Sequence, residues 1–306
     1  MSIAATRTSR RSSRLSFSLP ELRKGAVALV RLWIDLFDRH QLLNSAAAIS
    51  FQSLKALVPL TLFGISLLSM LGLADVWMST LRESISRHLT PTAFTAIDTA
   101  VQKILADGGW VLPVLAGAAL LWYGSGLVRA CMNGMNLIYE ADEERPFLRR
   151  WGISIVLALG IAVAVVLAVL GMTVGPRIAD DGAIQMLLLV VRWPFAVVAL
   201  GLGVGVLVHY GPAESRRARW ASVGSIVVVA AWIVEALLFG WYIGSLANFK
   251  SAAGALTVFL VLAGYLYTAS IIFLVGVQID ELLRKDASSS EEGVLGLIRR
   301  RAHTRR

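Results

Sequence analysis

Long apolar stretches alternate with short polar connections along most of this chain. Six stretches are rich in Leu, Val, Ala, Ile and Gly, and each is long enough for a helix that crosses a bilayer. The alternation of apolar and polar positions that is typical of membrane strands is absent from them. The pattern predicts an all-α polytopic membrane protein. Its six transmembrane helices are expected at about residues 44–73, 110–130, 152–174, 185–208, 220–243 and 254–282.

Two segments outside these spans have the pattern of amphipathic helices. Residues 20–40 place apolar side chains on one helical face, which is typical of a helix lying in the membrane interface. Residues 75–107 are expected to form an extracytoplasmic hairpin of two short helices. The break falls at Thr90 and Pro91, because threonine is a good N-cap and proline suits the first turn. The expected organisation is a basic disordered segment 1–19, one transmembrane domain 20–285 and a flexible basic cytoplasmic tail 286–306.

Composition and charge support a membrane environment and suggest an orientation. The chain is 57% hydrophobic and 16% charged, whereas soluble domains carry about 25% charged residues. Core helices of a soluble protein would need more amphipathic partners than this chain provides. Most of the 29 Lys and Arg residues lie before the first span, in the second-to-third and fourth-to-fifth connections, and after the last span. Because basic loops stay in the cytoplasm, both termini are expected there.

The net charge and the content of cysteine and histidine limit the partners and the reactions that are expected of this chain. A net charge of +9 fits a cytoplasmic rim that faces anionic lipid headgroups, so no nucleic-acid partner is expected. Cys131 is the single cysteine, and the four histidines are far apart in the sequence. With no paired-cysteine site and no Walker loop, we expect no metal, no cofactor and no enzymatic activity. The chain is compatible with a homo-oligomer.

Polar residues inside the spans are the candidates for function. On a helix, Gln52, Lys55 and Pro59 fall on one face of the first span. A charge near the bilayer centre costs at least ~2.5 kcal/mol, so Lys55 is expected to point into the bundle. Glu235 in the fifth span lies at a depth where it could pair with Lys55 or with Arg192 of the fourth. An ion pair that only neutralises buried charge is the alternative.

The sixth span adds two further polar residues to a candidate cavity wall. The proposed pathway for a substrate or ion consists of Gln52, Lys55, Pro59, Arg192, Glu235, Tyr267 and Gln278. These residues favour a secondary transporter or translocator that moves a small solute or a lipid through a polar cavity within the bundle. The alternative is a non-transporting scaffold or assembly factor of the envelope, whose outer hairpin and inner basic loops bind partners.

Three segments carry the pattern of a known family. They are "AAAISFQSLKALVPL" in the first span, "GSGLVRACMNGMNLIYEADEERPFLRR" after it, and "AGALTVFLVLAGYLYTASIIFLVGVQIDELL" at the end. They resemble the YihY/BrkB family of bacterial inner-membrane proteins, formerly labelled ribonuclease BN. Gln278 stands where that family usually has glutamate. The resemblance covers roughly residues 25–285 and implies six transmembrane helices, cytoplasmic termini, and roles in the envelope, in virulence or in transport. A membrane ribonuclease is not expected, because the sequence holds no catalytic constellation.

Overall fold

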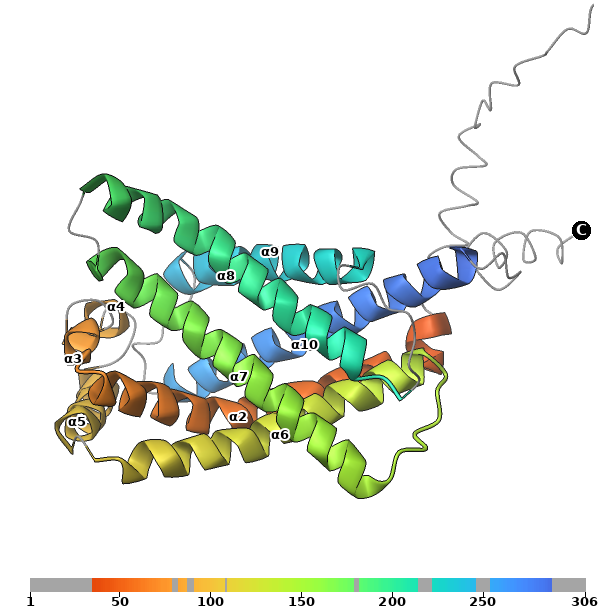
Figure 1. The fold of residues 1–306 in the computed structure, drawn as a ribbon, viewed down its shortest axis with the longest axis horizontal. Coiled ribbons are helices and arrows are strands. Elements are labelled where there is room, and N and C mark those ends of the chain that lie inside the picture. The colour runs from red at the N-terminus through yellow and green to blue at the C-terminus, as the bar shows by residue number, and fades with distance from the viewer. Residues whose placement is uncertain are drawn as a thin grey trace, which may run out of the picture.

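The computed structural model describes residues 35–78, 82–86, 91–107, 109–178, 182–213, 222–245 and 254–287. Every regular element within these ranges is a helix, as predicted. Six of the helices have 23 residues or more, and at about 1.5 Å per residue each exceeds a hydrocarbon core of about 30 Å. They are α2 (Leu42–Met70), α6 (Val111–Ile138), α7 (Phe147–Ile178), α8 (Gly182–Tyr210), α9 (Val223–Ser245) and α10 (Gly254–Ala287) (Figure 1).

The apolar character of these helices agrees with a membrane location. By length and composition, α2, α6 and α9 and the described parts of α7 and α10 can cross a bilayer. In α8 the apolar part with described side chains, Pro194–Tyr210, is shorter. The six long helices coincide with the six predicted spans, and the chain is an all-α polytopic membrane protein.

The connection between α6 and α7 is shorter than predicted, because both helices extend into it. Hydropathy placed the end of the second span near residue 130 and the start of the third at 152. In the structure α6 continues to Ile138, and α7 begins at Phe147. Hydropathy fails here because the extra turns carry Asn133, Asn136 and Arg150, which lower the apolar average without breaking a helix.

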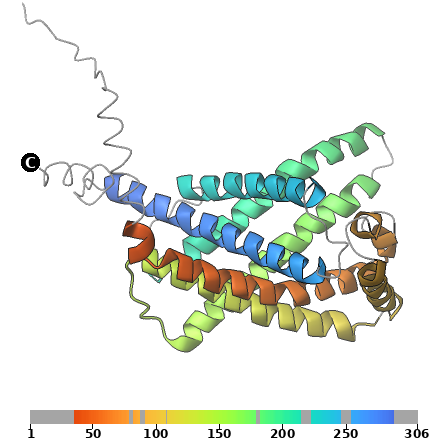
Figure 2. The same cartoon turned by 180° about the vertical axis from the view of Figure 1, so that it is seen from behind.

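The long helices form a closed ring in which each contacts its two neighbours. Around the ring the order is α2, α6, α7, α8, α9 and α10, and α10 packs against α2. Helices α2, α7 and α9 begin at the end of the bundle where α6, α8 and α10 end (Figures 1 and 2). We call this the basic end, because Arg145, Arg149 and Arg150, between the end of α6 and the first turn of α7, lie there.

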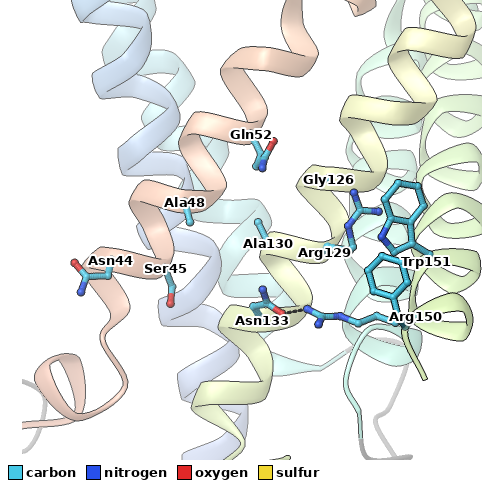
Figure 3. A pocket seen from close by; sticks show the side chains of 11 residues that line it. Asn44, Ser45, Ala48, Gln52, Gly126, Arg129, Ala130, Asn133, Arg150 and Trp151 are labelled. Carbon is cyan, nitrogen blue, oxygen red and sulfur yellow. Dashed lines mark hydrogen bonds between the residues drawn. The ribbon is translucent and has the colours of Figure 1, made fainter. Parts of the chain in front are cut away.

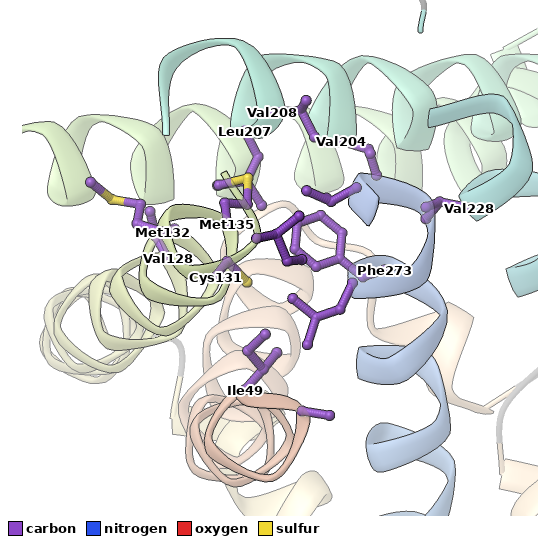
Figure 4. Packing of buried hydrophobic residues seen from close by; sticks show 14 of the residues in the cluster. Ile49, Val128, Cys131, Met132, Met135, Val204, Leu207, Val208, Val228 and Phe273 are labelled. Carbon is purple, nitrogen blue, oxygen red and sulfur yellow. The ribbon is translucent and has the colours of Figure 1, made fainter. Parts of the chain in front are cut away.

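The buried apolar core lies in the half of the bundle next to the basic end. Figure 4 shows side chains of α2, α6, α8, α9 and α10 meeting around Phe273. The most deeply buried members include Leu42, Ala46, Met132, Met135, Ile138, Leu274 and Val277. This half therefore holds the ring together by side-chain packing.

Glycines allow the closest helix crossings in this half. A Cβ atom on Gly134 of α6 would lie 2.8 Å from Leu274 of α10 and 3.5 Å from the Ser45 side chain of α2. At the start of α9, a Cβ on Gly224 would overlap the carbonyl oxygen of Gly276. The backbone nitrogen of Gly224 also donates a 2.7 Å hydrogen bond to Asp280. Small residues thus let α6, α9 and α10 approach more closely than larger side chains would.

A cap of short helices lies at the opposite end of the bundle, against α2 (Figure 1). The sequence predicted two short helices in this segment, whereas the described residues form three, the last of which begins at Pro91. The cap contains α3 (Ala74–Val76), α4 (Arg82–Ser86) and α5 (Pro91–Asp107). The Asp98 carboxylate joins all three by accepting hydrogen bonds from Trp77, Arg82 and Gln102. Burial opposes ionisation, but these hydrogen bonds and the charge of Arg82 hold the pKa of Asp98 below its ordinary value.

The predictions for the chain ends fall mostly outside the described residues. These are the disordered segment 1–19, most of the interfacial helix 20–40 and the tail beyond residue 287. Residues 35–39 belong to that interfacial segment, and they are helical as predicted.

The crossing of α9 and α10 gives a test of the packing. We expect Gly224→Ala to lower the free energy of unfolding by about 1–3 kcal/mol, because the added methyl group meets backbone on α10. Denaturant titration of the protein in detergent micelles measures this change. The control is Gly240→Ala in the same helix, where a Cβ has no neighbour within 4 Å. A loss of stability equal to that of the control would contradict the close crossing.

Candidate functional site

A polar groove runs along the basic end where α2, α6 and α7 meet (Figure 3). It encloses a cavity of about 530 Å³. From α2, the groove is lined by residues on successive turns of one helix face, namely Asn44, Ser45, Ala48 and Gln52. The other lining residues are Gly126, Arg129, Ala130 and Asn133 of α6 and Phe147, Arg150 and Trp151 of α7. We call this the arginine groove.

Arg129 is held in the groove by neutral partners. Its guanidinium donates hydrogen bonds to the hydroxyls of Ser125 (3.1 Å) and Ser154 (2.9 Å). It also lies over the ring of Trp151, 4.3 Å from the ring centroid. Figure 3 shows this stacking, with Gln52 approaching from α2. These contacts fix the position of the guanidinium without neutralising its charge.

Arg150 supplies the second cation of the groove. Its guanidinium donates a hydrogen bond to Asn133 of α6 (Figure 3). Its Nε forms a 3.7 Å salt bridge with Glu143, a carboxylate that also binds Arg145. None of the residues that line the groove is acidic. The groove therefore presents two positive charges and neutral hydrogen-bonding groups, the donor set that carboxylates and phosphates require.

Aromatic side chains border the groove on the α7 side. Phe147 is 70% exposed, and Trp122, beside the groove, is 60% exposed. Trp122 contacts Trp151 edge to face, with ring centroids 4.9 Å apart. Exposed aromatic rings beside arginines are typical of the headgroup level of a membrane, where rings lie in apolar surroundings and cations meet phosphates.

Lys55 continues the polar face of α2 beyond Gln52, but it does not point into the bundle as predicted. It is exposed, and its ammonium lies 5.4 Å from the ring centroids of both Phe51 and Tyr123. Periodicity identified the correct face of α2. That face meets α6 along an open seam, where two aromatic rings stabilise the cation at the surface.

A network of side chains fixes the connection between α6 and α7. Arg145 donates hydrogen bonds of 2.6 and 2.8 Å to the two oxygens of Glu143, which also accepts one from Asn136. Arg145 also donates a hydrogen bond to the backbone carbonyl of Gly211. The side-chain oxygen of Asn136 accepts a hydrogen bond from the backbone N–H of Ala213, just after α8. The hydrogen bonds from Arg145 hold the pKa of Glu143 below its ordinary value, although partial burial opposes this.

Glu235 lies elsewhere, in a pocket between α9 and α10. Both of its carboxylate oxygens are buried, and they have no hydrogen-bond partner within the described part of the chain. The predicted pair with Lys55 is therefore wrong, since Lys55 lies against rings of α2 and α6. The side chain of Arg192 is outside the described residues, so the alternative pair stays a prediction.

The remaining predicted residues have structural surroundings. Pro59 is buried within α2, which continues through it without interruption. Tyr267 is partly buried against the apolar core. Gln278 is 1% exposed, and its carbonyl oxygen lies 2.7 Å from Nδ1 of His40, which ties the segment before α2 to α10. The single cavity predicted from the sequence is thus divided among separate places, and only Gln52 lies in the arginine groove.

Sequence reasoning missed the two arginines of the groove. It counted Arg129 and Arg150 as charges of a connection, which predicted a side of the membrane for them but not their environment. A detectable signal was the spacing of Ser125, Arg129 and Asn133, which lie four residues apart and share a helix face. In the described part of the chain, no group of His, Cys, Asp and Glu gathers as a metal site would require.

Comparison with known proteins identifies the family. The sequence profile of the family described as virulence factor BrkB matches residues 33–294. The chain belongs to this family. The resemblance inferred from the first, middle and last segments is therefore confirmed. No solved structure matches the BrkB-family chain significantly.

Curated relatives are similar along most of this chain. The ribonuclease-like protein YfkH of Bacillus subtilis is 25% identical over 270 residues, which cover 84% of this chain and 97% of that protein. A UPF0761 membrane protein of Halorhodospira halophila is 25% identical, over 82% of this chain and 56% of its own length. Another, from Aliivibrio salmonicida, is 24% identical over 77% of this chain and 76% of its own. Several relatives are thus much longer than the BrkB-family chain described here.

The network around Glu143 gives a test that depends on pH. We expect Glu143→Gln to speed amide hydrogen exchange in residues 141–146 and 207–213 about tenfold at pH 7, as for a lost charge-assisted hydrogen bond of about 1.5 kcal/mol. The folded pKa lies below the ordinary 4.5, so the contribution of Glu143 is complete above that value. It disappears as the pH falls through the lower, folded pKa. Equal exchange in the two proteins at pH 7 would contradict the network.

Proposed function

We propose that this BrkB-family membrane protein is a translocator of amphiphiles that carry an anionic headgroup, and that the arginine groove is where the headgroup binds. The observation that carries the proposal is Arg129, a cation whose printed partners are all neutral, with Arg150 lining the same groove among neutral hydrogen-bonding side chains. A small anionic solute would use the same donors. A lipid is favoured because the groove lies beside exposed aromatic side chains rather than inside a closed bundle.

We also propose the orientation that the charge pattern favours. The basic end faces the cytoplasm of a bacterial inner membrane, and α3 to α5 lie on the outer side. The groove then lies in the cytoplasmic leaflet. Arg129 is nine residues before the end of α6, about 14 Å along the helix axis, which is the depth of phosphate and upper acyl chains. The proposal involves no bond cleavage, so the protein acts as a carrier and not as an enzyme.

The translocation proposal is tested by lipid flux in proteoliposomes. Vesicles contain fluorescent phosphatidylglycerol, and dithionite bleaches the dye in the outer leaflet. We expect the protein to accelerate movement of this lipid between leaflets, and Arg129→Gln or Arg150→Gln to slow it about tenfold, because charge-assisted hydrogen bonds to the phosphate are lost. An uncharged fluorescent glycolipid should show no dependence on either arginine.

Arg39→Gln is the matched control for the groove variants. Arg39 is a basic-end cation outside the groove, its side chain is 72% exposed, and it pairs with Glu140 at 3.6 Å. Its removal changes the net charge equally but should alter flux less than twofold, as for other exposed pairs worth about 0–1 kcal/mol. Flux no faster than in protein-free vesicles would overturn translocation. It would favour the scaffold alternative instead.

The orientation has its own test. Lys103 on α5 and Glu144 in the α6–α7 connection are both exposed, at opposite ends of the bundle. Cys131 is buried, so it should contribute little background to thiol labelling. In intact spheroplasts we expect a membrane-impermeant maleimide to label Lys103→Cys fully and Glu144→Cys only after lysis. The reverse pattern would show that the basic end is outside.

A further inference from the structure

The pocket around Glu235 lies on a different helix seam from the arginine groove. It is formed by α9 and α10 and has a volume of about 770 Å³. Its polar or aromatic lining residues are Glu235, Phe239 and Tyr242 of α9 and Tyr265 and Thr268 of α10. The remaining lining residues are glycine and aliphatic side chains. One carboxylate thus faces an otherwise apolar and aromatic pocket.

Glu235 lies near the middle of its helix and has no hydrogen-bond partner among the described residues. It is twelve residues after Val223, about 18 Å along α9. Both carboxylate oxygens are buried and accept no hydrogen bond from the described residues. The described cations nearest the bilayer centre are engaged elsewhere, Lys55 by two rings and Arg129 by two serines and a tryptophan. An ionised carboxylate at this depth needs a cation, because its burial alone is unfavourable.

Aromatic rings supply the rest of a cation site. The rings of Phe239 and Tyr265 are 4.5 Å apart between centroids, with 36° between their planes, and Tyr242 lines the same pocket. The faces of such rings attract cations, and several rings around a carboxylate are the usual receptor for ammonium groups. A metal ion is a poorer fit, since the lining provides few oxygen ligands besides the carboxylate.

The surroundings of the pocket indicate how a ligand would reach it. Leu237, Leu238 and Trp241 on α9 are 70%, 62% and 65% exposed, on helices that cross the membrane. A ligand entering through this surface has to be soluble in lipid. A hydrocarbon chain would contact the aliphatic side chains while a cationic head reaches Glu235.

We propose that the pocket between α9 and α10 binds amphiphilic cations, with the ammonium group paired to Glu235 and placed beside the rings of Phe239 and Tyr265. This site is separate from the headgroup site in the arginine groove and selects the opposite charge. It does not depend on translocation, so it can exist in a carrier or in a scaffold.

Photolabelling of the full chain in lipid nanodiscs tests the site. The probe is hexadecylamine that carries a diazirine in mid-chain, and hexadecanol with the same diazirine corrects for partition into lipid. We expect the amine to label α9 and α10 peptides about tenfold more than the alcohol, as an ion pair and cation–π contacts in a desolvated site predict. Glu235→Gln should reduce amine labelling to the level of the alcohol. A diazirine-bearing phosphatidylethanolamine shows whether a lipid headgroup amine also enters.

Three further variants keep the test decisive. Glu235→Asp retains the charge and should retain most of the labelling. Tyr265→Leu removes one ring and should reduce labelling partly. Gln52→Ala in the arginine groove should leave it unchanged. Equal labelling by the amine and the alcohol, or labelling that persists in Glu235→Gln, overturns the proposal. Loss of phosphatidylglycerol flux in the groove variants with amine labelling intact would separate the two sites.

Discussion

The lack of water in the bilayer is the constraint on which the rest of this structure depends. A charged or hydrogen-bonding side chain on a spanning helix must find a partner in the protein, reach the interface or bind a ligand. The ring of six helices meets this constraint at its seams. Polar groups such as Gln52 and Arg129 lie where two helices meet, whereas α9 presents Leu237 and Trp241 outward. Polar chemistry is therefore confined to a few narrow strips of the surface.

Side-chain packing determines which of these polar strips form a groove that a ligand can enter. The buried core gathers next to the basic end, where glycines such as Gly134 and Gly224 bring α2, α6, α9 and α10 into close contact. The arginine groove lies beside this rigid part, and Glu143 and Arg145 fix the connection that begins α7. Groups on such a frame keep their geometry without a ligand, which lowers the ordering cost when a headgroup binds.

The sequence predicted the positions of the helices well, but not which helices and side chains lie next to one another. Helices follow from runs of apolar residues, and Pro91 marked a boundary because proline has a local effect. Periodicity also identified the polar face of α2 that carries Gln52 and Lys55. It could not say that this face meets α6 along an open seam, because that depends on the rotation and order of the helices in space. The pairing of Glu235 with Lys55 was misjudged for the same reason, since equal depth in the membrane does not place two helices side by side.

A purely structural role explains Arg129 less well than a binding role does. Arg150 has a salt bridge to Glu143, but no acid lies among the residues that line the groove around Arg129. Arg129 is instead positioned by Ser125, Ser154 and Trp151, which orient a guanidinium but leave its charge uncompensated. For holding α6 to α7, a leucine in place of Arg129 would bury more apolar area and cost no desolvation. An anion in the groove, such as the lipid headgroup proposed above, would supply the missing counter-charge, and lipid headgroups are the abundant anions at a membrane surface.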